Sequence, residues 1–380
     1  MAPSSRTEPG PRAPRPTVVL RRRDLLISLT ATGVLAGCGN DPTSPSANTG
    51  WPGDLPATSA TWQELPVPPM VPRRRPTLTW TGSEVLVTGG EFIPATTPPP
   101  CPANADCYFP SNPVTDGAAF DPATGTWRHF DDAPAFHHEP VWTGSLLTDG
   151  WTWFDPASGA RGQAPWSDLL VYAPAWWSGS EVVCVGTDGS MEPVAHTLWA
   201  CNPVTGATRT SPVPSPAAGE SVSTFGTDHE LFVGTSKIID AECSSGGSCG
   251  RLNAWDAVTG SWRAVDGELV ASGWDGSRGV GIRWDDSGPV GVVTVDPADG
   301  SSSELPALPA ALRGSPRLLV GPGRIAVSES GRTAVLDGTQ WVALPELTIA
   351  PDSVPTVEWA GDRLVAWDDS GRTGRSIQLE

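Results

Sequence analysis

The chain has 380 residues and a formal net charge of −18 at pH 7, so it would repel phosphate backbones, and nucleic acid is excluded as an expected partner. Its 42 glycines and 41 prolines, with no long helical periodicity after the first 38 residues, exclude a mainly helical protein. About 320 residues remain from residue 60 onward, which predicts either two domains or one large repetitive β domain.

The first 37 residues have the pattern of an export signal. Arginines at 21, 22 and 23 precede an apolar run over residues 25–35, which is too short to cross a bilayer core of about 30 Å. The stretch LAGC at residues 35–38 resembles the lipobox of bacterial lipoproteins. That resemblance implies cleavage before Cys38, a diacylglycerol on its thiol, and a protein anchored in the cell membrane on the extracytoplasmic side.

Two further features fit export. Residues 22–26, RRDLL, are similar to a twin-arginine signal, although the usual Ser or Thr before the arginines and the Phe after them are missing. Residues 38–59 are rich in Pro, Ser, Thr and Gly and contain few apolar residues, so they cannot offset the entropy of ordering. We expect this segment to be a tether and residues 60–380 to form the folded domain.

Two short phrases recur along the rest of the chain. One is an aromatic or apolar residue followed by Asp or Asn, then usually Pro, and Gly three residues later, which is the chemistry of a hairpin turn. It occurs at residues 120–125, 154–159, 201–206, 255–260 and 295–300. The other, Trp-x-Gly before an apolar strand, occurs at residues 80–82, 142–144, 177–179, 274–276 and 359–361. Together they indicate four-stranded units of about 35 to 60 residues, the size of a propeller blade.

The first and fourth units carry a family resemblance. Six residues separate Phe120 from Trp127 and Trp255 from Trp262, and paired glycines end the strand at residues 85–90. This combination resembles the kelch repeat, although the other units lack the second Trp or the paired glycines. The WD40 repeat is the near alternative because Trp255 is followed by Asp. Either resemblance implies an all-β protein built as a single β-propeller.

Counting the units predicts about seven four-stranded blades. Six are complete, and the chain ends after three strands of the seventh, at residues 355–380. Residues 61–66 form an isolated strand-like piece that we expect to complete the last blade, because closing the ring hides exposed strand edges. The six complete units lie near residues 77–130, 138–166, 172–214, 221–265, 270–307 and 315–344.

The long insertions favour one face of such a ring for binding. Residues 90–116, 186–197 and 240–251 all join second to third strands, which places them on the face that also holds the links between blades. The first insertion offers Tyr108 and Phe109 as an aromatic pair for recognition. The alternative is that these loops only cap the ring.

Six cysteines follow Cys38, and an even number in an exported chain indicates disulfides. Six cysteines allow about 15 pairings, and proximity favours three neighbouring pairs. The alternative is a zinc site that would join four of them, although their spacing is wider than structural zinc usually has. The expected pairs are Cys101 with Cys107, Cys184 with Cys201, and Cys243 with Cys249.

Polar clusters on the same face could bind a metal. His137, His138 and Glu139 stand in the link between the first two blades and could hold a transition metal, or could be a solvated link. Asp240 and Glu242 could hold Ca²⁺, or could be ordinary surface residues. We therefore predict no bound cofactor, with calcium or a transition metal as the alternative.

The sequence favours a binding module over an enzyme. A galactose-oxidase-like copper site would resemble a pair of tyrosines, one of them linked to a cysteine, with two histidines. The chain has only Tyr108 and Tyr172, and Tyr108 follows a cysteine that we expect to be in a disulfide. A sialidase-like Asp box is present only as a fragment at residues 369–373. We expect a monomeric, membrane-anchored module that binds a protein or a neutral glycan or cationic partner. The alternative is a secreted oxidoreductase or glycan hydrolase that uses the loop-rich face or the central channel.

Overall fold

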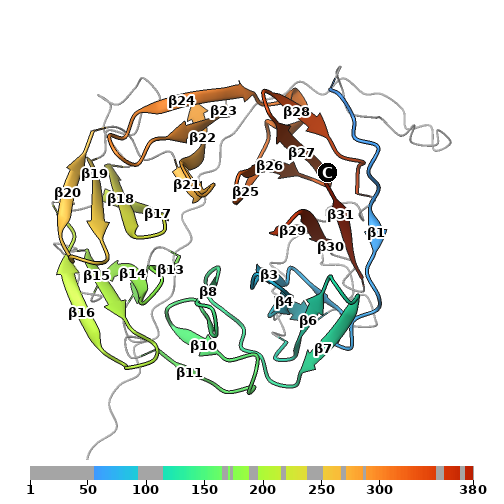
Figure 1. The fold of residues 1–380 in the computed structure, drawn as a ribbon, viewed down its shortest axis with the longest axis horizontal. Helices are drawn as coiled ribbons and strands as arrows, with labels where there is room; N and C mark the ends of the chain where they lie inside the picture. Colours follow the sequence, from blue (N-terminus) through green and yellow to red (C-terminus); the bar gives the residue numbers. More distant parts are fainter. Residues whose placement is uncertain are drawn as a thin grey trace, which may run out of the picture. The chain divides into compact units, whose positions relative to one another are not determined.

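The folded part of the chain is a β-propeller with seven blades, each a four-stranded antiparallel sheet (Figure 1). This is a computed structural model, and it describes residues 55–92, 114–164, 170–171, 174–187, 196–214, 220–237, 251–266, 271–285, 288–347, 355–368 and 373–379. The predicted fold class and the predicted order of units are confirmed. No helix in the described part of the chain has the length and apolar character needed to cross a membrane.

The first three blades follow the predicted units, and each runs in chain order from its inner to its outer strand. They are β3 (Thr77–Trp80), β4 (Val85–Thr88), β6 (Gly117–Asp121) and β7 (Thr126–Phe130); β8 (Val141–Trp142), β9 (Leu147–Thr148), β10 (Thr152–Phe154) and β11 (Arg161–Gln163); and β13 (Trp176–Trp177), β14 (Val182–Thr187), β15 (Thr197–Cys201) and β16 (Thr208–Pro212), with β12 (Leu170–Val171) also pairing with β14.

The remaining four blades complete the ring. They are β17 (Glu220–Gly226), β18 (Glu230–Lys237), β19 (Arg251–Asp256) and β20 (Trp262–Val265); β21 (Ala271–Trp274), β22 (Gly279–Asp285), β23 (Gly288–Val295) and β24 (Ser302–Ala307); β25 (Arg317–Gly321), β26 (Arg324–Glu329), β27 (Arg332–Asp337) and β28 (Gln340–Ala343); and β29 (Thr356–Ala360), β30 (Arg363–Trp367), β31 (Gly374–Gln378) and β1 (Gln63–Glu64). A separate pair, β2 (Arg73–Arg74) with β5 (Glu91–Phe92), and one 3₁₀ turn, Ala310–Leu312, lie outside the blades.

The recurring Asp-Pro-x-x-Gly phrase forms the hairpin between the third and fourth strands, as predicted. Asp121 Oδ1 accepts the amide of Ala123 at 2.8 Å, and Gly125 takes a φ of 69°, a region that L side chains rarely adopt. The Ala123 amide, followed by the Thr124 hydroxyl, lowers the pKa of Asp121. The turn is therefore specified locally, by the same few residue types in five of the seven blades.

The last blade takes its fourth strand from the other end of the chain. β1 pairs antiparallel with β31, with Gln63 opposite Ser376, and Figure 1 shows the blue β1 strand beside the dark red β31 strand. Trp62 Nε1 donates to the carbonyl of Pro345 at 2.7 Å, and Leu65 is buried next to Trp367. The predicted closure of the ring by the N-terminal strand is confirmed.

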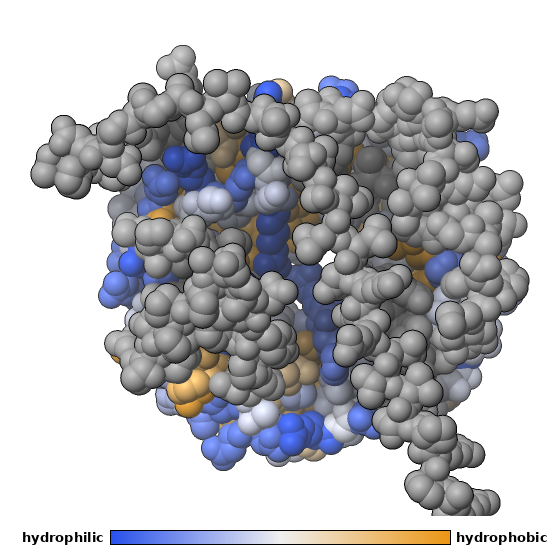
Figure 2. Space-filling view, turned by 180° about the vertical axis from the view of Figure 1, so that it is seen from behind, coloured by the Kyte–Doolittle hydropathy of each residue, from blue (hydrophilic) through white to orange (hydrophobic). Residues whose placement is uncertain are grey.

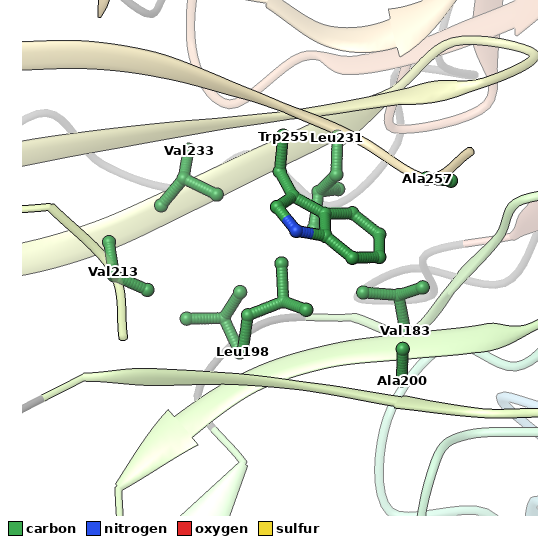
Figure 3. Packing of buried hydrophobic residues seen from close by; sticks show 9 residues of the cluster. Val183, Leu198, Ala200, Val213, Leu231, Val233, Trp255 and Ala257 are labelled. Carbon is green, nitrogen blue, oxygen red and sulfur yellow. The ribbon is translucent and has the colours of Figure 1, made fainter. Parts of the chain in front are cut away.

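The hydrophobic core lies between neighbouring blades. Strand β14 is buried along its whole length because its alternate side chains pack against different blades. Val183 and Val185 face the fourth blade, where they meet Trp255, whereas Val182 and Cys184 face the second blade. Figure 3 shows the first of these interfaces, which contains Val183, Leu198, Ala200, Val213, Leu231, Val233, Trp255 and Ala257.

A repeated arginine bridge joins neighbouring blades near their outer strands. Arg263, on β20, donates to both carboxylate oxygens of Glu230 at 2.8 and 2.9 Å and to the carbonyl of Pro297 in the next blade at 2.7 Å. Charge-assisted, forked bonds of this kind are among the stronger hydrogen bonds in proteins. Arg209 forms the same forked pair with Glu181 and donates to the Ala257 carbonyl, and Arg128 donates once to Glu84 and to the Pro156 carbonyl.

The predicted disulfide between Cys184 and Cys201 is wrong: no disulfide joins them in the structure. The register explains this, because Cys184 stands opposite Trp199 while Cys201 stands opposite Val182. The two cysteines are therefore diagonal neighbours, a placement with a spacing of about 7–8 Å, beyond the usual reach of a disulfide. Both side chains are buried in the interface with the second blade, and this desolvation raises the pKa of Cys201.

Candidate functional site at the mouth of the central channel

The inner strands of the seven blades enclose a central channel. Each inner strand contacts the inner strand of the next blade, in the order β3, β8, β13, β17, β21, β25, β29 and back to β3. Inner strands begin at the face where one blade is linked to the next and end at the short turns on the opposite face. Residues at the start of an inner strand therefore surround the mouth of the channel on the link face, the face predicted to bind a ligand.

A cavity of about 560 Å³ lies along one side of this channel. The residues that line it include Trp80, Trp142 and Trp176, which come from the inner strands of three consecutive blades. Among the described residues that line it, the charged ones are Glu139 and Glu358. The cavity has the volume of a typical small-molecule site and combines apolar walls with a few polar groups. Figure 2 shows hydrophilic residues near the opening at the centre of the view from behind.

Three charged side chains from distant parts of the chain meet at the mouth. Arg317, the first residue of β25, donates to Glu139 at 3.0 Å and lies 4.0 Å from the carboxylate of Glu358 on β29. Glu139 precedes β8, so the cluster joins the second, sixth and seventh blades. Two carboxylates share one guanidinium, which leaves the cluster with one excess negative charge when all three groups are ionised.

The surroundings of Glu358 shift the pKa of its carboxyl group. The side chain is 25% exposed to solvent, and the channel wall around it removes much of its hydration. Desolvation raises the pKa of Glu358 to about 7; Arg317 opposes this shift and Glu139 adds to it. A carboxyl group that titrates near neutral pH in a cavity is a common feature of functional sites.

The shift predicts a pH-dependent cost to folding. Because the folded-state pKa of Glu358 is raised from 4.5 to about 7, the folded state holds a proton that the unfolded state releases between these values. Its contribution to stability is therefore present below pH 4.5 and is lost as the pH rises to 7. Relative to Glu358→Gln, the free energy of unfolding of the native protein should fall by at most about 3 kcal/mol from pH 4.5 to 8.

Chemical denaturation at several pH values measures this difference. Glu304→Gln is a matched control because Glu304 is an exposed carboxylate on an outer strand. The control should keep the native pH profile. A Glu358→Gln profile parallel to that of the native protein would show that this carboxyl group does not titrate in the expected window.

The structure separates the predicted His137–His138–Glu139 cluster. His137 and His138 both lie against the ring of Trp151, with centroid distances of 5.1 and 5.9 Å, whereas Glu139 pairs with Arg317. The buried carboxylate beside His137 belongs to Asp149, which accepts the amides of His137, Trp151 and Thr152. Within the described ranges, no three metal-ligating side chains converge.

Several predicted site residues lie outside the described residues. These are Cys38, Tyr108, Phe109, Asp240, Glu242, Cys101, Cys107, Cys243 and Cys249. The structure adds Arg317, Glu358 and the three channel tryptophans, which sequence reasoning missed. The available signal was their place on the first strand of a unit, since first strands line the channel in a propeller.

The base of the first insertion is fixed by a buried ion pair. Arg73 is fully buried; it donates to Asp116 Oδ1 at 2.5 Å and to the carbonyls of Gly89 and Asp116 at 3.0 and 2.7 Å. Asp116 Oδ2 also accepts the amide of Val71 at 2.8 Å. These bonds hold together the two chain segments that flank residues 93–113, so the insertion leaves the ring from a rigid base.

Solved structures with the same architecture are distant in sequence. The β-propeller domain of the Trilobed protease from Pyrococcus furiosus, described as having an open velcro topology, matches with a TM-score of 0.52 at 9% identity, over 82% of this chain and 95% of that one. Catalytically inactive virginiamycin B lyase from Staphylococcus aureus, with quinupristin, matches with a TM-score of 0.51 at 12% identity, over 85% of this chain and 100% of that one. These likenesses show a shared fold alone. No protein-family model and no curated protein matches the sequence.

Proposed function

We propose that this protein is a membrane-anchored, extracytoplasmic binding module of the kelch-like type, and that its ligand enters the channel from the link face. The observation that carries the proposal is the channel cavity, with tryptophan walls and the Glu139–Arg317–Glu358 cluster at its mouth. Apolar walls with a few convergent polar groups are the usual composition of a ligand site. The raised pKa of Glu358 supports the proposal, since perturbed pKa values cluster at functional sites.

The anchoring part of the proposal rests on the LAGC stretch at residues 35–38 and on the tether that follows it. An acyl chain on Cys38 would hold the protein at the bilayer, and a polar tether would keep the ring away from the surface.

The second function that the cavity could serve is that of a secreted enzyme with its active site in the channel. Glu358 is the observation that supports this alternative, because a carboxyl group that titrates near pH 7 can transfer protons.

Two measurements in the native host test the anchor and the channel site separately. The Cys38→Ala protein should move from the membrane fraction to the soluble fraction or stay unprocessed, whereas the native protein should carry the mass of a lipidated chain. Native protein purified from membranes should retain a small molecule, detected by mass spectrometry, that the Glu139→Gln/Glu358→Gln double variant loses at an unchanged melting temperature. Normal membrane attachment of Cys38→Ala would refute the anchor, and equal retention by the double variant would refute the channel site.

A further inference from the structure

We infer that the channel cavity binds a small organic cation, a quaternary or protonated amine that carries an apolar group. This inference rests on the proposed binding function and names the ligand class for the same site. The juxtaposition behind it is that three tryptophans and two glutamates line one cavity.

The aromatic wall is the first observation. Trp80, Trp142 and Trp176 line the cavity and are each partly buried, because their side chains also pack against the apolar cores between blades. The face of an aromatic ring attracts a cation, most strongly for tryptophan, and several rings around one space are a common way to hold an ammonium group. The indole nitrogen of Trp176 donates to the carbonyl of Thr227 at 2.9 Å, so its N–H is already satisfied within the protein.

The charge of the mouth is the second observation. Arg317 approaches Glu139 more closely than Glu358, at 3.0 against 4.0 Å, so Glu358 is the less compensated carboxylate. A cation in the cavity would neutralise it, while an anion would face two carboxylates. Arg317 at the mouth is already paired with Glu139 and lies beside Glu358, and the described residues of the cavity wall include no further Lys, Arg or His.

The volume of the cavity sets the size of the ligand. About 560 Å³ exceeds what an inorganic cation or a single ammonium group would fill. An amine with an attached apolar group would use the aromatic wall and the carboxylates at the same time. A neutral sugar would leave the excess negative charge of the mouth uncompensated, which makes it the less favoured occupant.

The test compares a cation with its uncharged isostere. Choline and 3,3-dimethylbutan-1-ol have nearly the same shape and differ in charge, and each can be titrated into the native protein at pH 8.5, where Glu358 is ionised. Tryptophan fluorescence or the indole NMR signals report occupancy of the cavity. We expect choline to bind about tenfold more tightly than the alcohol.

Two variants locate the effect. Glu358→Gln should weaken choline binding about fivefold and leave the alcohol unchanged, whereas Glu304→Gln, on an outer strand, should change neither. Equal affinities for the two probes, or choline binding that ignores Glu358→Gln, would overturn the inference. If the cavity takes up a neutral sugar such as glucose instead, the ligand class is wrong while the proposed binding function stands. If neither probe binds but the native protein still retains a host molecule that the double variant loses, only the ligand class fails.

Discussion

A chain that begins at residue 67 is expected to lose the cooperative unfolding transition that a chain beginning at residue 49 shows. The truncation removes β1, which supplies the fourth strand of the last blade. It also removes the partly buried Trp62 and the buried Leu65 from the cores around that blade, and full burial of a side chain of this size contributes about 1.5–3 kcal/mol. Together with the lost strand pairing, the expected cost is above about 5 kcal/mol, comparable with the whole stability of many domains.

The reason is the geometry of a closed ring. Without β1, strand β31 becomes an exposed edge that can pair with other molecules, so aggregation should accompany the loss of stability. Thermal unfolding followed by circular dichroism, with light scattering on the same samples, measures both effects. A chain beginning at residue 61 is the control, since it keeps β1 and loses only the contacts of residues 55–60. If the melting temperatures of the chains that begin at residues 49 and 67 differ by less than about 5 °C, the role assigned to β1 is contradicted.

Replacing Arg73 with Met is expected to reduce the free energy of unfolding by about 3–5 kcal/mol, because the change leaves the Asp116 carboxylate without its buried partner. Arg73 is fully buried, and burial lowers its pKa although the attraction of Asp116 opposes that shift. Its guanidinium binds Asp116 and three backbone carbonyls, those of Val71, Gly89 and Asp116. Urea denaturation at pH 7 measures the loss.

Two further variants separate the charge from the shape of Arg73. Arg73→Lys keeps the charge but cannot form the forked bond, so it should recover less than half of the loss. The Arg73→Met/Asp116→Asn double variant removes both charges and should be more stable than Arg73→Met alone. If Arg73→Met costs less than about 1 kcal/mol, the buried pair does not hold the base of the first insertion.

Blade number and ring closure could be predicted because their signals are local and repeated. The repeated turn between third and fourth strands is encoded by Asp, Gly and a few neighbours in sequence; Gly125 is an example, since its positive φ follows from its own turn. The register within a sheet was not predicted, and this is why the pairing of Cys184 with Cys201 was wrong. A shift of two residues along one strand separates two cysteines without changing which face they share.

The sequence by itself determined the elements of the folded part: the turns, the seven units and the unpaired strand that closes the ring. The tertiary structure decided the site. Glu139, Arg317 and Glu358 come from three blades and lie up to 219 positions apart, and no local pattern relates them. They meet because the seven blades form a closed ring in which the last inner strand contacts the first. The inner strands of all seven blades therefore surround one channel, and residues far apart in the sequence lie together at its mouth.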